Sequence, residues 1–470
     1  MPGIDTAPGA AHPRGTLLEQ LAGRIARMTF ADIDARGRTV ARTAFADTLG
    51  VALAGSRSEA VRLVQAAAVC STPAGSLILG TAGRADALDA GLLNGIASHA
   101  LDFDDGNLTL VGHPSTILVP AVLALGEETD ATLREAATAY AAGYEVLIRL
   151  ARSVNTAHYV KGWHPTSTLG VVGAAAAAAH LLRLDAARTA VALAIALSSA
   201  AGIKANFGTM TKPLHIGQAV RNGLLAARLA AAGFTANPEA LDTVQGFLNV
   251  YNGAGAYDTQ AITLGLDSPP LLNNEVNPIK AYACCHSTHG AIEAAREIRE
   301  LDGFRIGDIE RITVIVDEKR IPHTDRPVLA EALAGKFSLQ YVVARMLLTG
   351  SVDLADFEGD AHRDPAVLSL MEHIEVAPAP PRREKNSFGA VVRVKHADGA
   401  VLTAVRDPER DGSGTEIDPP RLWAKFTDCA EQVLPSDTVG DLRALLQDFP
   451  GPGTVRGLMK LAEVHGGDAR

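Results

Sequence analysis

The segment of this chain best suited to chemistry is an acidic turn enclosed by histidines. Two histidines flank three carboxylates, and a proline follows: His99, Asp102, Asp104, Asp105, His113 and Pro114. Because a proline disfavours helix at the preceding residue, we expect a turn between two apolar helices. A carboxylate buried there must find donors or shift its pKa. A functional site and a solvated acidic loop both remain compatible with this segment alone.

Two later segments place basic side chains where helices are expected to begin. His164 precedes a helix that Thr166 or Ser167 can cap, so its imidazole would stand at the positive end of the helix dipole. Lys212 precedes Pro213, which we assign to the first position of another helix. A lysine there is unfavourable unless an anion binds beside it. The structural alternatives are a capping loop with a surface histidine and a solvent-facing lysine.

A further segment, residues 280–290, begins at Lys280 and contains His286 and His289, which would share one face of a helix. Metal binding is possible on this spacing, but no carboxylate lies near them in sequence. The four cysteines, Cys70, Cys284, Cys285 and Cys429, are not spaced as zinc or iron–sulfur ligands. We therefore expect no metal and no cofactor.

Composition narrows the class of protein. The 470 residues are 47% hydrophobic but only 4% aromatic, which predicts a large core of small aliphatic side chains and more than one domain. A net charge of -10 argues against nucleic acid or an anionic membrane as a partner. No apolar run is long enough to span a bilayer. The cysteine pattern and the absence of a signal peptide predict a cytoplasmic protein.

Periodicity predicts a mainly α protein with an α+β second domain. We expect no strand before residue 252, and helices over 15–28, 34–54, 58–69, 85–100, 117–127, 131–154 (capped by Asp130), 167–182, 186–199 and 217–232. Strands are expected over 309–317, 374–377, 390–396 and 400–406, with helices over 291–301, 337–348 and after 422. The predicted division is a disordered lead-in (1–14), a helical domain (15–272), an α+β domain (273–407) and a linker with C-terminal helices (408–470).

Taken in order, these segments resemble the MmgE/PrpD family. The resemblance is carried by HALDFDD (99–105) with GHPS (112–115), GWHPTS (162–167), TKPLHIG (211–217), CCHSTH (284–289), KFSLQY (336–341) and KFTDC (425–429). It covers nearly the whole chain. It implies a large helical domain formed from both chain ends, a smaller α+β lid and a homodimer.

The resemblance also implies a reaction class. Family substrates are small di- or tricarboxylates that react at a carbon next to a carboxylate. We therefore expect a cofactor-independent lyase, a dehydratase or decarboxylase of a substrate such as 2-methylcitrate or cis-aconitate. The alternatives are an epimerase of a dicarboxylate such as iminodisuccinate and a non-catalytic protein that binds carboxylates.

The site residues follow from the same resemblance and from the chemistry of proton transfer beside a carboxylate. The expected catalytic groups are His113 and His164 for proton transfer, Lys212 to clamp a carboxylate, and Asp102 to tune a histidine or act as the base. The expected substrate-binding residues are Lys280, His289, His323, Asp105 and Thr166, with His289 completing the site on lid closure.

Two positions depart from the decarboxylase pattern: Gly106 replaces a threonine and His323 replaces a tyrosine. The loop from Asp102 to His113 is also one residue longer, which is closer to the epimerase.

Overall fold

The computed structural model describes residues 15–68, 72, 74–380, 388–406 and 419–464. The predicted lead-in over 1–14, Cys70 and residues 407–418 of the predicted linker lie outside this range. None of the described helices is long and apolar enough to cross a membrane.

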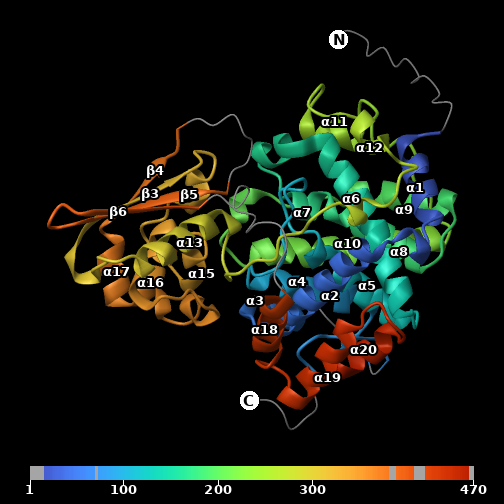
Figure 1. Cartoon of the computed structure of the whole chain (residues 1–470). Helices are drawn as coiled ribbons and strands as arrows, with labels where there is room; N and C mark the ends of the chain where they lie inside the picture. Colours follow the sequence, from blue (N-terminus) through green and yellow to red (C-terminus); the bar gives the residue numbers. More distant parts are fainter. Residues whose placement is uncertain (1–14, 69–71, 73, 381–387, 407–418, 465–470) are drawn as a thin grey trace.

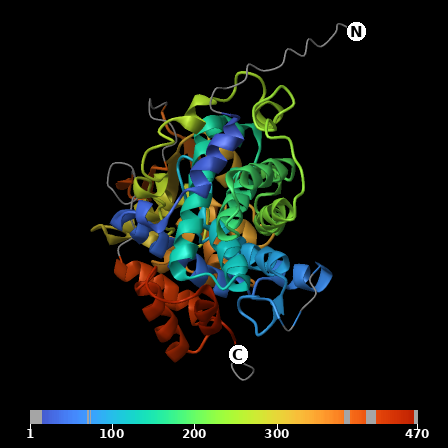
Figure 2. The same ribbon diagram turned by 90° about the vertical axis from the view of Figure 1, so that its right-hand side faces the viewer.

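The larger part of the molecule is a helical bundle built from both ends of the chain (Figure 1). Its helices are α1 (Leu17–Ala26), α2 (Ala35–Gly55), α3 (Glu59–Ala68), α4 (Ala87–Ala100), α5 (Ser115–Glu128), α6 (Leu133–Lys161), α7 (Pro165–Thr168), α8 (Gly170–Leu181), α9 (Ala186–Ser198), α10 (Thr211–Ala231), α11 (Phe247–Asn252) and α12 (Gln260–Thr263). The C-terminal helices α18 (Pro419–Ala430), α19 (Ser436–Gln447) and α20 (Val455–Leu461) join the same apolar core. In Figures 1 and 2 they cover one end of the bundle, where α18 contacts α2.

The second part contains a four-stranded mixed sheet with its own core. Its elements are α13 (His286–Glu300), β3 (Ile309–Val316), α14 (Ile321–Thr324), α15 (Ala332–Gly335), α16 (Leu339–Thr349), α17 (Pro365–Met371), β4 (Ile374–Pro378), β5 (Ala390–His396) and β6 (Val401–Arg406). The strand order is β4-β3-β5-β6, with β3 and β4 parallel and the other pairs antiparallel. Figure 1 shows α13 and α16 on one face of the sheet. The mainly α fold with an α+β part is therefore confirmed.

Local capping accounts for several differences from the predicted elements. Asp130 does not cap α6; it lies in a turn at φ 54°, and Thr132 is the cap. The Thr132 hydroxyl accepts from the Glu135 amide, and the Glu135 carboxylate accepts from the Thr132 amide. This reciprocal pair fixes the helix start two residues later than the aspartate predicts.

Two short strands, β1 (Ser76–Leu77) and β2 (Arg84–Ala85), also occur where no strand was expected.

The helices that carry site residues begin earlier than predicted. α10 starts at Thr211, so Lys212 lies within its first turn and Pro213 is its third residue rather than its first. Pro213 is tolerated there because the first-turn amides have no partner within the helix. Thr166 and Ser167 lie inside α7 and do not cap it; His164 occupies the N-cap position.

Close packing of α4 against α10 brings the acidic turn next to Lys212. α4 ends at the turn, and α10 begins with Lys212. A Cβ at Gly95 would lie 3.0 Å from the Gly217 Cα, and one at Gly217 would lie 2.3 Å from the Leu92 carbonyl oxygen. The helices approach this closely because neither glycine has a side chain.

We predict that Gly217→Ala lowers the free energy of unfolding by about 1–3 kcal/mol, because the added methyl meets backbone rather than a flexible side chain. Urea unfolding measures the change. Gly440→Ala is the matched control, since a Cβ there has nothing within 4 Å and α19 gains helix propensity. Equal stability of both variants would contradict the packing argument.

Candidate active site

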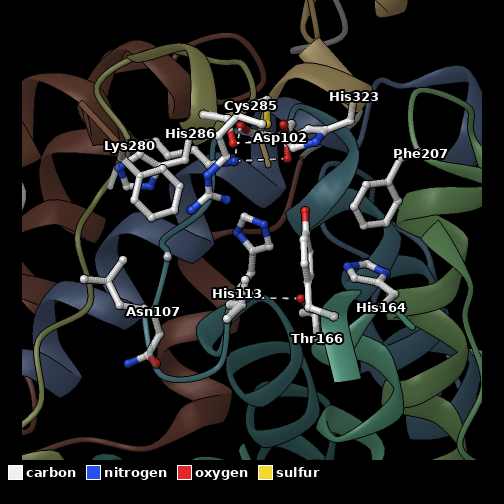
Figure 3. A pocket seen from close by; sticks show the side chains of 18 of the residues that line it. Asp102, Asn107, His113, His164, Thr166, Phe207, Lys280, Cys285, His286 and His323 are labelled. Atoms are coloured by element: carbon white, nitrogen blue, oxygen red, sulfur yellow. Dashed lines mark hydrogen bonds and ion pairs between the residues drawn. The ribbon is translucent and has the colours of Figure 1, made fainter. Parts of the chain in front are cut away.

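A cavity of about 660 Å³, part of it open to solvent, lies where the helical bundle meets the α+β part. Figure 3 shows side chains from both parts facing it. Seven of the predicted site residues line it: Asp102, His113, His164, Thr166, Lys212, Lys280 and His323. Asp105 and His289 are buried behind this wall. The structure thus brings together segments more than two hundred residues apart in sequence.

Three buried lysines hold the backbone of the acidic turn. They come from separate segments and donate to three successive carbonyl oxygens: Lys336 to Leu101 (2.6 Å), Lys280 to Asp102 (2.8 Å) and Lys425 to Phe103 (2.6 Å). Asp102 has φ 52°, a conformation that costs energy for a residue with a side chain. The lysine contacts stabilise this conformation, which a solvated acidic loop would have no reason to adopt.

The Asp102 carboxylate is bound by two of the surrounding cations. Its Oδ1 lies 2.5 Å from the Lys212 Nζ and 3.0 Å from the Lys280 Nζ. Burial alone would raise the pKa of Asp102, but the two lysine charges outweigh it and hold the pKa well below its usual value. Its Oδ2 is buried and has no partner among the described residues. Asp102 therefore stays ionised and pairs with lysines rather than with a histidine.

Asp104 takes the histidine-orienting role that the sequence assigned to Asp102. Its Oδ2 lies 2.8 Å from the His99 Nδ1 and 3.3 Å from the His113 Nδ1. Burial raises the pKa of Asp104, but the neighbouring imidazoles outweigh this effect and the net shift is downward. The His113 Nδ1 also donates to the Asp105 carbonyl oxygen over 2.6 Å. Since a carbonyl only accepts, Nδ1 carries the proton and Nε2 keeps its lone pair.

His113 is poised as a neutral base. Burial, helped by Lys280 and Lys212, lowers its pKa to about 3 against the opposing charge of Asp104. Figure 3 shows its ring pointing into the cavity. The Thr166 hydroxyl accepts from the His113 amide over 3.2 Å. A Cβ at Gly112 would lie 2.6 Å from that hydroxyl oxygen, so the turn can pack on α7 only with glycine there.

Asp105 supports the site from outside the cavity. Its carboxyl contacts the Ser115 hydroxyl and accepts from the Ser115 amide over 3.2 Å. Burial raises its pKa well above the usual value against the lowering effect of the Ser115 hydrogen bonds, and the charges of Asp104 and Asp47 raise it further. Burial therefore affects the three aspartates differently. Lysines lower the pKa of Asp102 and histidines lower that of Asp104, whereas the pKa of Asp105 is raised.

His164 faces the cavity from the start of α7. Its amide donates to the Gly202 carbonyl oxygen over 3.0 Å, and its Nδ1 lies 3.2 Å from the His215 Nδ1. Burial, then the charges of His99 and Lys212, lower its pKa well below the usual value. Its Nε2 is buried without a partner in the part of the chain that the structure describes. A neutral imidazole with a free nitrogen is suited to proton transfer.

On the α+β side, His286 rather than His289 lines the cavity. Both lie on α13 with ring centroids 5.0 Å apart, and the His289 Nε2 lies 3.3 Å from the Cys284 carbonyl oxygen. His323 does line the cavity, and its Nε2 lies 3.2 Å from the Ser287 hydroxyl oxygen. The expected contact of His289 with substrate therefore has no direct counterpart in this arrangement.

Several cavity residues were not singled out from the sequence. Arg320, Tyr159, Phe207 and Phe388 reach the cavity from a strand-to-helix connection, the end of α6 and two loops. Arg320, Tyr159 and Phe388 lie in none of the motifs named above, because their placement depends on how the two parts of the molecule meet. Arg320 lies three residues before the expected His323, and this proximity was the signal that the sequence offered.

Within the described residues, one group could bind a metal on distance alone. One ligand atom from each of His99, Asp104 and His113 lies within 4.8 Å of the others. However, the Nδ1 atoms of both histidines already hydrogen-bond to Asp104 or to the Asp105 carbonyl. We therefore interpret this group as the support that orients His113.

The cavity carries an excess of positive charge. Lys212, Lys280 and Arg320 line it, whereas Asp102 is the one carboxylate among its described lining residues. Buried cations in excess of their counterions favour an anionic ligand. With two neutral imidazoles in the same wall, the arrangement suits proton transfer on a small molecule with more than one carboxylate.

Comparison with known proteins agrees with this geometry. Residues 19–260 match the model of the MmgE/PrpD N-terminal domain, and residues 282–448 match that of the MmgE/PrpD C-terminal domain. The chain is 29% identical to cis-aconitate decarboxylase of Homo sapiens over 416 residues, 86% of this chain and 85% of that protein. It is 28% identical to cis-aconitate decarboxylase of Aspergillus terreus (strain NIH 2624 / FGSC A1156) over 370 residues, covering 73% and 74%.

The buried histidines predict an acid-sensitive fold. His99, His158 and His164 have lowered pKa values, to about 4 for His158. The unfolded chain binds their protons near pH 6.5 and the folded chain does not, so stability is full above that pH and falls below it. For His158 the loss approaches roughly 1.4 kcal/mol per pH unit between pH 6.5 and 5, and His99 and His164 contribute in the same direction.

Urea unfolding at a series of pH values measures this loss. His158→Gln removes one contributing imidazole outside the cavity and should make the fall shallower. A free energy of unfolding that stays level or rises between pH 6.5 and 5 would show that these imidazoles are protonated in the folded state.

Proposed function

This chain belongs to the MmgE/PrpD family, and from that premise we propose that it is a cofactor-independent carboxy-lyase acting on a tricarboxylate such as cis-aconitate. The names of its relatives in Homo sapiens and Aspergillus terreus support decarboxylation over dehydration or epimerisation. The observation that carries the proposal is the cavity itself. Lysines and neutral imidazoles line one cavity, which is partly open to solvent.

The proposed reaction needs charge stabilisation and one proton. In cis-aconitate the bond between the methylene carbon and its carboxylate breaks, and carbon dioxide leaves without the electron pair. The pair shifts the double bond, so negative charge develops on the former vinyl carbon and its attached carboxylate. A proton delivered to that carbon gives methylenesuccinate. Cations aimed at the conjugated carboxylate lower the energy of this extended enolate.

The residues divide these tasks by chemistry. Lys212 and Lys280 both contact Asp102 and line the cavity, and we assign the binding of a substrate carboxylate to Lys212. His113 and His164 are neutral in the free protein. Bound carboxylates add negative charge to the same enclosed space and raise the imidazole pKa. A histidine then takes up a proton as substrate binds and delivers it to carbon.

The two departures from the decarboxylase pattern, Gly106 and His323, both bear on the shape of the cavity. Both residues line the cavity, and a Cβ at Gly106 would lie 3.3 Å from the His286 Nδ1. A threonine there would press on His286. We propose that the glycine and the histidines change the shape of one wall while leaving Lys212, His113 and His164 in place.

The direct test is proton NMR of the protein with cis-aconitate in deuterium oxide. We expect loss of the substrate signals and growth of two vinylidene signals from methylenesuccinate, unchanged by a chelator. Deuterium exchange into a chiral dicarboxylate such as iminodisuccinate, without a change of carbon skeleton, would instead indicate an epimerase. No reaction with cis-aconitate, 2-methylcitrate or a dicarboxylate panel would refute lyase activity.

His164→Ala tests the assigned proton transfer. We expect kcat to fall roughly 100-fold or more, because general acid–base catalysis contributes at least that much. His373→Ala, at an exposed position outside the cavity, is the matched control and should keep full turnover. Thermal melting checks that both variants are folded. A folded His164→Ala variant with wild-type kcat would remove His164 from the mechanism.

A further inference from the structure

Arg320 is a buried cation that has no counterion among the residues the structure describes. It lies between β3 and α14 and is only 6% exposed. Its guanidinium stacks 4.0 Å from the centroid of the Phe388 ring. Its Nη2 is buried, and no described residue accepts a hydrogen bond from it or pairs with its charge. Leaving a buried guanidinium uncompensated is unfavourable, so this position calls for an anion.

The cavity beside Arg320 has polar groups that could bind an anion, but the described residues place no carboxylate next to Arg320. Arg320 lines the cavity together with Ser287 and His323. Asp102, the described carboxylate in that wall, is already bound by Lys212 and Lys280. Burial and the nearby Arg320 charge lower the pKa of Lys204 to about 8, which places a further basic group on this side. Arg320 therefore adds a positive charge to the cavity from the α+β part of the molecule, whereas Lys204 approaches it from the helical bundle.

We propose that Arg320 forms a second carboxylate subsite, which binds a carboxylate of the substrate that does not react. The planar guanidinium can donate two parallel hydrogen bonds to one carboxylate, and the Ser287 hydroxyl can donate a third. The inference rests on the proposed function and deepens it: the substrate must carry carboxylates at both ends. A ligand bridging Lys212 and Arg320 also ties the helical bundle to the α+β part.

Calorimetric titration with tricarballylate, a saturated tricarboxylate that cannot be decarboxylated in the same way, tests the subsite without turnover. We expect Arg320→Gln to weaken binding by about 10- to 100-fold, as for hydrogen bonds to charged groups. Arg320→Lys keeps the charge but loses the planar fork, so its loss should be smaller. Lys319→Gln, at the exposed neighbouring residue, removes the same charge outside the cavity and should bind as the wild type does.

The outcomes separate this proposal from the proposed function. Wild-type affinity in Arg320→Gln, equal losses in Arg320→Gln and Lys319→Gln, or no binding by the wild type would overturn the subsite. Arg320-dependent binding of tricarballylate without turnover of cis-aconitate would support the subsite and overturn the lyase. If Arg320→Gln does not fold, as thermal melting would show, Arg320→Lys serves as the test and must weaken binding more than Lys319→Gln does.

Discussion

The arrangement depends on the pairing of buried Asp102 with Lys212 and Lys280. The Asp102 carboxylate stays ionised in this buried position because two cations contact it, and its charge in turn helps to raise the pKa of Lys280 against the effect of burial. Lys336 and Lys425 then fix the carbonyl groups on either side of that residue. Four separate segments of the chain must therefore be in place before the turn can adopt its conformation.

Burial also keeps the imidazoles of His113 and His164 neutral. Desolvation is the largest cause of the low pKa of His113 and of His164, and the surrounding lysines add to it. Asp104 counteracts this for His113 without reversing it, while the Asp105 carbonyl fixes which ring nitrogen of His113 carries the proton. The lining carries more positive than negative charge, and a polycarboxylate would balance it by supplying negative charge.

Sequence patterns predicted what depends on local chemistry. The acidic turn, the α+β region and the basic residues at helix starts follow from turn residues, alternation and capping. The choice between His286 and His289 could not be predicted, because residues three apart on α13 share a broad face and only packing decides which one reaches the cavity. Arg320 and Tyr159 belong to no motif, and they reach the site only through the contact between the two parts. Homodimerisation stays a prediction.

The most direct test of the central claim is a crystal structure of the protein with tricarballylate bound. The account predicts one carboxylate within hydrogen-bond distance of the Lys212 Nζ, with the His113 and His164 imidazoles facing the same ligand. Asp102 should keep its contact with Lys280. A ligand bound elsewhere, or one that displaces Asp102 from both lysines, would contradict the account.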